Sequence, residues 1–120
     1  MFKNLRNSLL SAWMIACCGS AVAAASIPRQ FQGVWTPSAA ECKTYKQDGV
    51  TDQGFNVSAT GYQQYETGCD LKKVIRADRV SFIGDFTCNV EGNTSTGTDT
   101  FVLSNGALHV NDSETLRRCK

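Results

Sequence analysis

The chain has 120 residues, of which 42% are hydrophobic and 19% are charged, and its formal net charge is +1. This length supports a single domain. Acidic and basic residues are interspersed, which excludes nucleic acid or an anionic membrane as the main partner, because both require a basic stripe. We interpret the one basic cluster, Arg117-Arg118-Cys119-Lys120, as a solvated C-terminus.

The first 25 residues have the composition of an export signal. Lys3 and Arg6 form a positive start, residues 9–19 form a short apolar run, and Ala21-Val22-Ala23 or Ala23-Ala24-Ala25 supplies a small-residue cleavage site. The apolar run is shorter than the roughly 20 residues that a spanning helix needs. We therefore predict a signal peptide over residues 1–25 and a bacterial protein exported to the periplasm or the medium.

Cleavage between Ala24 and Ile27 would leave a mature domain over residues 26–120. Loss of Lys3 and Arg6 leaves ten basic residues against 11 acidic ones, so the mature net charge becomes about −1. A domain this small buries only a modest core and benefits from cross-links.

Cys17 permits a second interpretation of the same segment. Met14-Ile15-Ala16-Cys17 resembles the lipobox of bacterial lipoproteins, in which the Cys carries lipid. That motif usually has Leu where Met14 stands, and the apolar run before it is short. We therefore expect Cys17 and Cys18 to leave with the signal, and membrane attachment only if Cys17 is lipidated.

The mature chain has the pattern of an all-β protein. Phe31, Val34 and Trp35 supply a first strand, and from Phe55 onward β-branched and aromatic residues alternate with turn residues every eight to twelve positions. We predict an antiparallel meander of about seven or eight strands that closes into a barrel, because closure removes exposed edges. We expect no helix beyond a single turn at residues 37–41, where Ser38 can cap and Glu41 follows three residues later.

Asn105-Gly106 predicts a tight hairpin, since a type I′ turn favours these residues. Pairing around it places Leu103 opposite Leu108 and Phe101 opposite Val110 on one face. His109 then lies opposite Val102 on the other face.

A second hairpin joins residues 71–75 to residues 80–86. A turn centred between Asp78 and Arg79 pairs Ile75 with Phe82, Leu71 with Phe86, and Cys69 with Cys88. This register places Lys73 on the apolar face opposite Gly84, where either its side chain extends to solvent or a bulge intervenes.

Two further turns complete the meander. Ala59-Thr60-Gly61 can close a three-residue hairpin with Gly61 in the left-handed conformation. This arrangement would place Phe55, Val57 and Tyr65 on one face. Glu91-Gly92 is a turn between the Cys88 strand and residues 94–100.

Four cysteines remain after the signal and allow three pairings. The hairpin register selects Cys69–Cys88, which leaves Cys42–Cys119 as the bridge that ties the region after the first strand to the C-terminus. A zinc site is disfavoured because the chain has no C-x₂-C knuckle. We predict two disulfides and no metal site or cofactor.

The candidate chemical groups do not form a catalytic set. The single histidine, His109, falls on the outer face without a predicted nucleophile or carboxylate partner. Glu66, Asp70 and Asp85 have the pattern of strand-surface charges rather than a glycosidase pair. Asp48-Gly49 and residues 52–54 lack the alternating ligands of a calcium loop. We predict that the protein is not an enzyme.

Several motifs resemble those of known families. Phe31-x-Gly33-x-Trp35, Cys42, Tyr65-Glu66, Cys88-x-x-Glu91-Gly92 and Arg118-Cys119 form a frame that resembles small exported proteobacterial β-barrel proteins of unknown function. Gly33-x-Trp35 also resembles the opening of lipocalin and avidin barrels. Size, export and cysteines are similar to those of the periplasmic inhibitors of c-type lysozyme, and residues 58–61 resemble the Ser-Ala-Ser-Gly loop that this family inserts into its target. The Trp-x-Lys-Gly element of those inhibitors is missing.

These observations favour a non-enzymatic binding module that engages an exported protein partner, such as a wall-degrading enzyme or a toxin. The candidate contact surface is a loop over residues 43–53, where Tyr45 stands between Lys43 and Lys46. The same segment is equally consistent with a plain connecting loop. The alternative function is a lipocalin-like barrel that binds a small apolar ligand, although Trp35, Phe82, Phe86 and Phe101 would nearly fill an eight-stranded barrel.

Overall fold

A computed structural model describes residues 25–120 of the chain. The predicted signal peptide, its cleavage sites and Cys17 lie outside the described residues, apart from Ala25 at their start. The elements are a 3₁₀ helix η2 (Arg29–Phe31), β1 (Gly33–Thr36), α1 (Ala39–Asp48), β2 (Phe55–Val57), β3 (Gly61–Gln64), β4 (Thr67–Ala77), β5 (Ser81–Val90), β6 (Asn93–Ser104), β7 (Ala107–Val110) and β8 (Glu114–Arg118).

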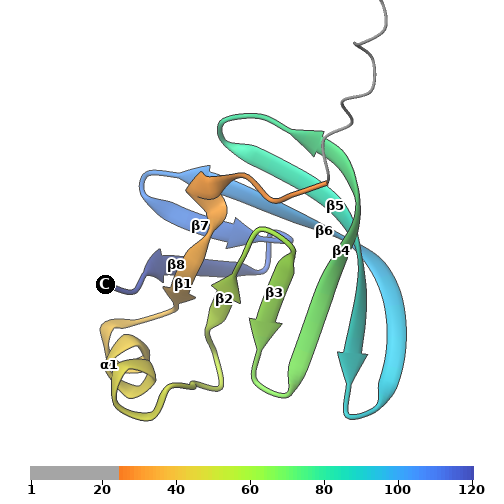
Figure 1. Cartoon of the computed structure of the whole chain (residues 1–120). Coiled ribbons are helices and arrows are strands. Elements are labelled where there is room, and N and C mark those ends of the chain that lie inside the picture. Colours follow the sequence, from red (N-terminus) through yellow and green to blue (C-terminus); the bar gives the residue numbers. More distant parts are fainter. Residues whose placement is uncertain (1–24) are drawn as a thin grey trace, which may run out of the picture.

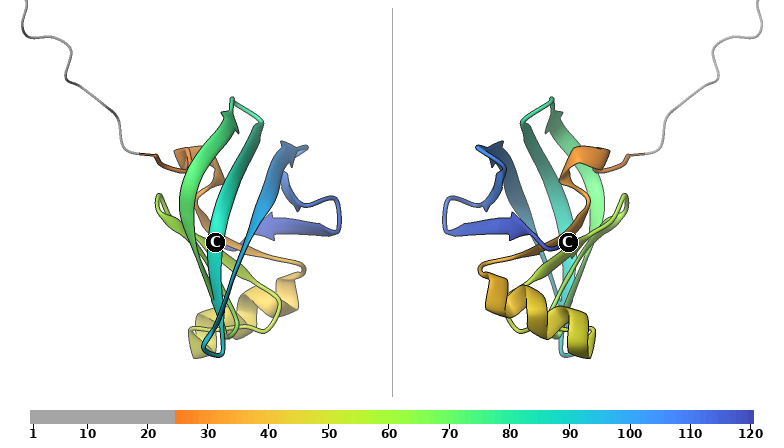
Figure 2. Two further views of the ribbon diagram at one scale, coloured as in Figure 1. Left: turned by 90° about the vertical axis from the view of Figure 1, so that its right-hand side faces the viewer. Right: turned by 90° about the vertical axis from the view of Figure 1, so that its left-hand side faces the viewer.

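The eight strands form a closed antiparallel barrel in sequential order (Figures 1 and 2). Each strand pairs with the next along the chain, and β1 closes the ring by pairing Trp35 with Arg118 of β8. This confirms the predicted meander and its closure. Phe31 precedes the first strand and lies in η2, whereas the prediction placed it in that strand.

Aromatic rings fill the interior of the barrel. Phe31, Tyr62, Phe82, Phe86 and Phe101 contact one another with ring centroids 5.1 to 6.4 Å apart. The buried apolar side chains of the core are Ile27, Phe31, Trp35, Phe55, Val57, Tyr62, Cys69, Phe82, Phe86, Phe101, Leu108, Val110 and Leu116. Burial of this apolar area is the main stabilising contribution to the fold.

The spacing of Gly33 and Trp35 has a geometric cause at the closure of the barrel. The Arg118 guanidinium lies 4.2 Å from the centre of the Trp35 ring and donates hydrogen bonds to the carbonyls of Gln32 and Gln30. A Cβ at residue 33 would lie 2.6 Å from Arg118 Nη1, and Gly33 has a φ of +119°. Glycine is therefore required beside the arginine that covers the tryptophan.

Both predicted disulfides are present. Cys69–Cys88 joins directly opposed residues of β4 and β5, as the hairpin register predicted. Cys42–Cys119 joins α1 to the segment that follows β8. The second bridge links residues 77 positions apart, against 19 for the first, so it restricts the unfolded chain more.

The β4–β5 hairpin follows the predicted register only in its lower half. Leu71 lies opposite Phe86, but two bulges then shift the pairing, so that Ala77 and not Ile75 lies opposite Phe82. The turn sets this shift, because the Asp78 carboxylate accepts the backbone N–H groups of Val80 and Ser81 at 3.0 and 2.8 Å.

The corrected register moves two side chains outward. Lys73 lies opposite Asp85 rather than Gly84, and Ile75 is exposed rather than packed on Phe82. A bulge therefore resolves the conflict that the sequence showed at Lys73.

Of the other predicted hairpins, two agree with the structure and one differs. The β6–β7 register matches the prediction at Leu103–Leu108, Phe101–Val110 and Val102–His109. The turn at Glu91-Gly92 is also confirmed. The β2–β3 hairpin differs, because its turn contains only Ala59 and Thr60, with Ser58 N–H bonded to the Gly61 carbonyl at 2.8 Å.

The shorter β2–β3 turn exchanges two tyrosines. Tyr62 lies opposite Val57 and is buried, whereas Tyr65 falls outside the strands and is exposed. The prediction that Tyr65 lies on the same face as Phe55 and Val57 is therefore wrong. A turn one residue shorter changes the register, so that Tyr62 and not Tyr65 lies on that face.

Helix α1 is the main departure from the sequence prediction, which expected one turn at most. Ser38 caps the helix, since its Oγ accepts the Glu41 N–H at 3.1 Å. Gly49 ends it with a φ of +80° and donates to the Tyr45 carbonyl at 2.7 Å. None of the ten helical side chains is buried. The apolar period that identifies a helix in a sequence is absent here, because this helix does not contribute to the core.

Candidate functional site

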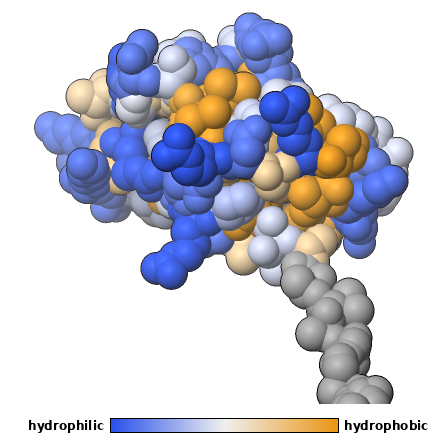
Figure 3. Space-filling model, turned by 90° about the horizontal axis from the view of Figure 1, so that it is seen from above, coloured by the Kyte–Doolittle hydropathy of each residue, from blue (hydrophilic) through white to orange (hydrophobic). Residues whose placement is uncertain are grey.

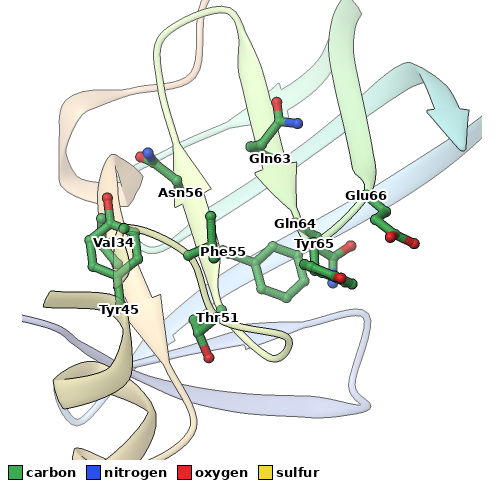
Figure 4. A pocket seen from close by; sticks show the side chains of 12 residues that line it. Val34, Tyr45, Thr51, Phe55, Asn56, Gln63, Gln64, Tyr65 and Glu66 are labelled. Carbon is green, nitrogen blue, oxygen red and sulfur yellow. The ribbon is translucent and has the colours of Figure 1, made fainter. Parts of the chain in front are cut away.

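Two surface depressions flank α1. The first, here called the tyrosine groove, has a volume of about 290 Å³ and lies between α1, the segment after it and the β2–β3 hairpin. Its lining residues are Val34, Tyr45, Gly49, Val50, Thr51, Gly54, Phe55, Asn56, Gln63, Gln64, Tyr65 and Glu66. Figure 4 shows Tyr45 beside Val34 at one side of the groove and Tyr65 beside Gln64 at the other, with Phe55 between them.

The tyrosine groove exposes apolar surface to solvent. Val50 and Tyr65 are 57% and 51% exposed, and both line it. The nearby Glu66 carboxylate and then Asp52 raise the pKa of the Tyr65 phenol. The groove therefore combines two aromatic rings, an exposed valine and hydrogen-bonding amides with a negative charge at one end.

The second depression, here called the basic groove, lies between α1 and the end of β8 and has a volume of about 480 Å³. Lys43, Lys46, Arg117 and Arg118 line it together with Cys42, Thr36, Ser38 and Ala39. The groove thus gathers four of the ten Lys and Arg residues within residues 25–120, and no acidic side chain lines it.

Backbone carbonyls, rather than carboxylates, fix the arginines of the basic groove. Arg117 donates to the Asn105 carbonyl at 3.1 Å, and Arg118 donates to Gln32 and Gln30. Within residues 25–120 the one ion pair is Arg76–Asp78, on another hairpin. The positive charge of the groove is therefore not neutralised by neighbouring carboxylates, and the groove favours anionic groups.

The structure places the three predicted contact residues on one helix. Tyr45 lines the tyrosine groove, whereas Lys43 and Lys46 line the basic groove on the other side of α1. Val50 falls within the predicted contact segment over residues 43–53, whereas neither Tyr65 nor the arginines were predicted as part of this surface. The arginine pair was visible as a basic cluster, but its position beside α1 follows from the Cys42–Cys119 bridge.

The position of α1 depends on four local constraints. The Ser38 cap and Gly49 fix its two ends. The Thr51 hydroxyl donates to the Glu41 carboxylate, which ties the following segment back to the first turn. The disulfide to Cys119 joins the middle of the helix to the barrel. The helix is thus held in place although none of its side chains is fully buried.

The remaining candidate groups stay apart from one another. His109 lies opposite Val102 as predicted, and its Nδ1 is 3.3 Å from the Thr115 hydroxyl. Asp85 accepts a hydrogen bond from Thr98 at 2.6 Å. Within the described part of the chain, no three His, Cys, Asp or Glu side chains form a group that could hold a metal ion.

One carboxylate is bound across the barrel interior. The Tyr62 hydroxyl donates to Asp99 at 2.6 Å, and the Asn111 amide donates to the same carboxylate at 2.9 Å. Burial, and then the hydrogen bond to Asp99, raises the pKa of the Tyr62 phenol. This contact links β3 to β6 and serves the structure of the barrel.

The upper end of the molecule carries a separate apolar surface (Figure 3). The β4–β5 turn lies at this end (Figure 1), and Ile75 and Val80 beside that turn are more than half exposed. The Gln30 amide of η2 donates to the carbonyls of Asp78 and Arg79, which fixes the turn over the barrel. The charged groups beside this surface are Arg76 and Asp78, which form an ion pair with each other, and the Ser81 hydroxyl also donates to the Asp78 carboxylate.

The two disulfides indicate an oxidising, extracellular or periplasmic compartment. No helix within residues 25–120 is long and apolar enough to cross a membrane. Comparison of the chain with protein-family models, curated proteins and solved structures gives no match.

Proposed function

We propose that this chain is an exported, non-enzymatic binding module that engages a protein partner through α1 and the two grooves beside it. The partner is an exported protein such as a wall-degrading enzyme or a toxin, and the chain acts on it as an inhibitor or immunity protein. The observation that carries this proposal is the construction of α1: a cap, a terminal glycine, a hydrogen bond and a disulfide fix a helix that buries none of its side chains.

A ten-residue helix without a buried face is marginal in water on its own. Its fixed position here keeps Tyr45, Lys43 and Lys46 in place before any partner arrives. A binding surface that is already ordered loses less conformational entropy on association. The rigidity of α1 therefore supports a recognition role better than a role in the stability of the barrel.

The chemistry of the grooves defines the partner. Tyrosine and arginine are enriched at the energetic centres of protein interfaces, and both line the surface around α1. The tyrosine groove fits an apolar side chain of the partner, and the basic groove fits acidic side chains. We expect a partner surface with an apolar residue beside an acidic cluster.

The alternative function, a lipocalin-like barrel that holds a small apolar ligand, has weaker support. The rings of Phe31, Phe82, Phe86 and Phe101 pack against one another in the interior, where such a ligand would bind. A ligand would have to displace this core.

Affinity capture tests the proposal. Immobilised domain is exposed to the exported proteins of the source cell and, separately, to purified c-type lysozyme. We expect one protein to bind stoichiometrically, and Tyr45→Ala or Lys43→Glu with Lys46→Glu to weaken its binding at least tenfold.

The matched control is Lys72→Glu with Lys73→Glu, which reverses two exposed charges on β4, away from α1. Equal retention of the partner by all variants would overturn the assignment of the surface. Co-purification of a small apolar molecule in place of a protein would favour the lipocalin-like alternative.

A further inference from the structure

Two strands of the barrel extend beyond their neighbours. β4 pairs with β3 only from Thr67 to Asp70, so its upper half has one free edge. β6 pairs with β7 only from Phe101 to Ser104, so its lower half, residues 93–99, has no strand on one side within residues 25–120. Each free edge presents backbone groups that another strand could bind.

The free edge of β4 carries features that prevent strand pairing. Bulges interrupt its ladder between Leu71 and Lys73 and between Val74 and Arg76. Lys72, Lys73 and Arg76 add exposed positive charges. Bulges and charged side chains are the means by which natural proteins keep edge strands from pairing.

The free edge of β6 has none of these features. Residues 93–98 are exposed, include no Lys, Arg or Pro, and pair with β5 without a register shift. The only charged residue in this half, Asp99, is bound by Tyr62 and Asn111. Residues 93–98 of β6 therefore form a regular, uncharged and open edge.

The hydrogen bonds of β6 show which groups face outward. The Thr100 N–H and C=O both bond to Asn111, on the side of β7. Backbone groups of alternate residues point to the same edge of a strand, so those of Thr94, Thr96 and Thr98 point there as well. These threonines have no strand partner within the described chain.

We propose that this edge pairs with the same edge of a second copy of the chain, antiparallel and centred on Thr96. Thr94 of each copy then lies opposite Thr98 of the other, and about six N–H···O=C bonds join the two sheets. An isologous contact requires a self-complementary surface, and this edge opposes no like charges and places threonine against threonine.

The pairing leaves the proposed binding surface accessible. In Figure 1 the lower ends of β5 and β6 lie on the opposite side of the barrel from α1. A dimer would present two copies of α1 to a repetitive or dimeric target and would gain avidity. Because a single strand pair makes a small interface, we expect a concentration-dependent dimer.

Sedimentation equilibrium and amide hydrogen exchange, both at increasing concentration, test the proposal on the mature protein. We expect a monomer–dimer equilibrium in which the Thr94, Thr96 and Thr98 amides become protected as the dimer forms. The Ser95 and Gly97 amides, which face β5, should change little. The proposal would be overturned if the protein stays monomeric at every concentration at which it is soluble, or if it dimerises and leaves these threonine amides exposed.

Two variants add a matched comparison. Thr96→Pro removes an edge N–H that no strand within the described chain uses, and proline is tolerated at such positions. It should abolish the dimer, while Thr96→Val, which keeps the N–H, should not. If Thr96→Pro fails to fold, the exchange pattern of the unmodified protein still decides. Neither measurement involves a partner protein, so their outcome is independent of the capture experiment. Protection of these amides that appears only when another protein is added would contradict self-pairing.

Discussion

The barrel and α1 are held in place by different means. In the barrel, aromatic rings from η2 and from strands distant in the sequence pack into one core, and the strand ladder closes on itself. In α1 no side chain is buried, and a cap, a glycine and a disulfide fix its position. A substitution in the barrel should therefore change global stability, whereas one in α1 should change local order or binding.

The largest effect is expected at Trp35, where the barrel closes. Trp35→Ala removes a buried ring, the hydrogen bond from its Nε1 to the Phe31 carbonyl at 2.9 Å, and the surface on which Arg118 lies. Such a loss costs about 5 kcal/mol, a large part of the roughly 5–15 kcal/mol available to a small domain. Urea denaturation measures this change.

Tyr45→Ala is the control on α1 and should change the free energy of unfolding by less than about 0.5 kcal/mol. Equal losses in both variants would contradict the division between the barrel and the helix.

Removal of the two disulfides should lower the free energy of unfolding by different amounts. Replacing Cys42 and Cys119 by alanine removes a loop constraint of about 4.5 kcal/mol by chain entropy, against about 3 kcal/mol for Cys69 and Cys88. We expect the first double variant to melt at the lower temperature and to be cleaved by protease within α1. A lower melting temperature for the Cys69–Cys88 variant would show that the hairpin bridge contributes more than chain entropy accounts for.

Tyr62 should make the stability of the barrel depend on pH in the alkaline range. Its pKa is raised in the folded protein, so the folded state retains the phenolic proton more strongly than the unfolded state. Stability from this group is fully present below about pH 10 and is lost as pH rises above it. Denaturation at increasing alkaline pH should show this loss.

Tyr62→Phe should remove that pH dependence and cost about 2 kcal/mol at neutral pH, because Asp99 loses a hydrogen bond. Tyr65→Phe, at an exposed tyrosine, is the matched control and should leave neutral-pH stability nearly unchanged. An unaltered alkaline slope in Tyr62→Phe would assign the effect to other groups.

Much of the barrel could be predicted from the sequence because its signals are local. Asn105-Gly106 and Glu91-Gly92 fix two turns, and the alternation around them fixes the faces of β6 and β7. The bulges of β4 could not be predicted from alternation, since they depend on how Asp78 holds its turn. The predicted register of the β2–β3 hairpin was wrong for a related reason. The turn is one residue shorter than predicted, so Tyr62 rather than Tyr65 is buried.

The candidate site was harder to predict because it depends on α1. The capping pair Ser38 and Glu41 is visible in the sequence. No apolar periodicity continues the helix, however, and its anchor Cys119 is 77 residues from Cys42. The two neighbouring lysines in the sequence predict Tyr45 as a contact residue. Its proximity to Tyr65 follows only from the position of the helix beside the β2–β3 hairpin.

The smallest effect is expected at the cap of α1. Ser38→Ala removes the acceptor for the Glu41 N–H and should cost about 1 kcal/mol of helix stability. Because α1 is joined to the barrel by a disulfide rather than by packing, this cost should appear as faster hydrogen exchange of the α1 amides, with little change in global melting temperature. Thr44→Ala, at an exposed position within the helix, should slow exchange slightly, since alanine has the higher helix propensity. If Ser38→Ala instead accelerates exchange equally in β5 and β6, then α1 and the barrel unfold as one unit.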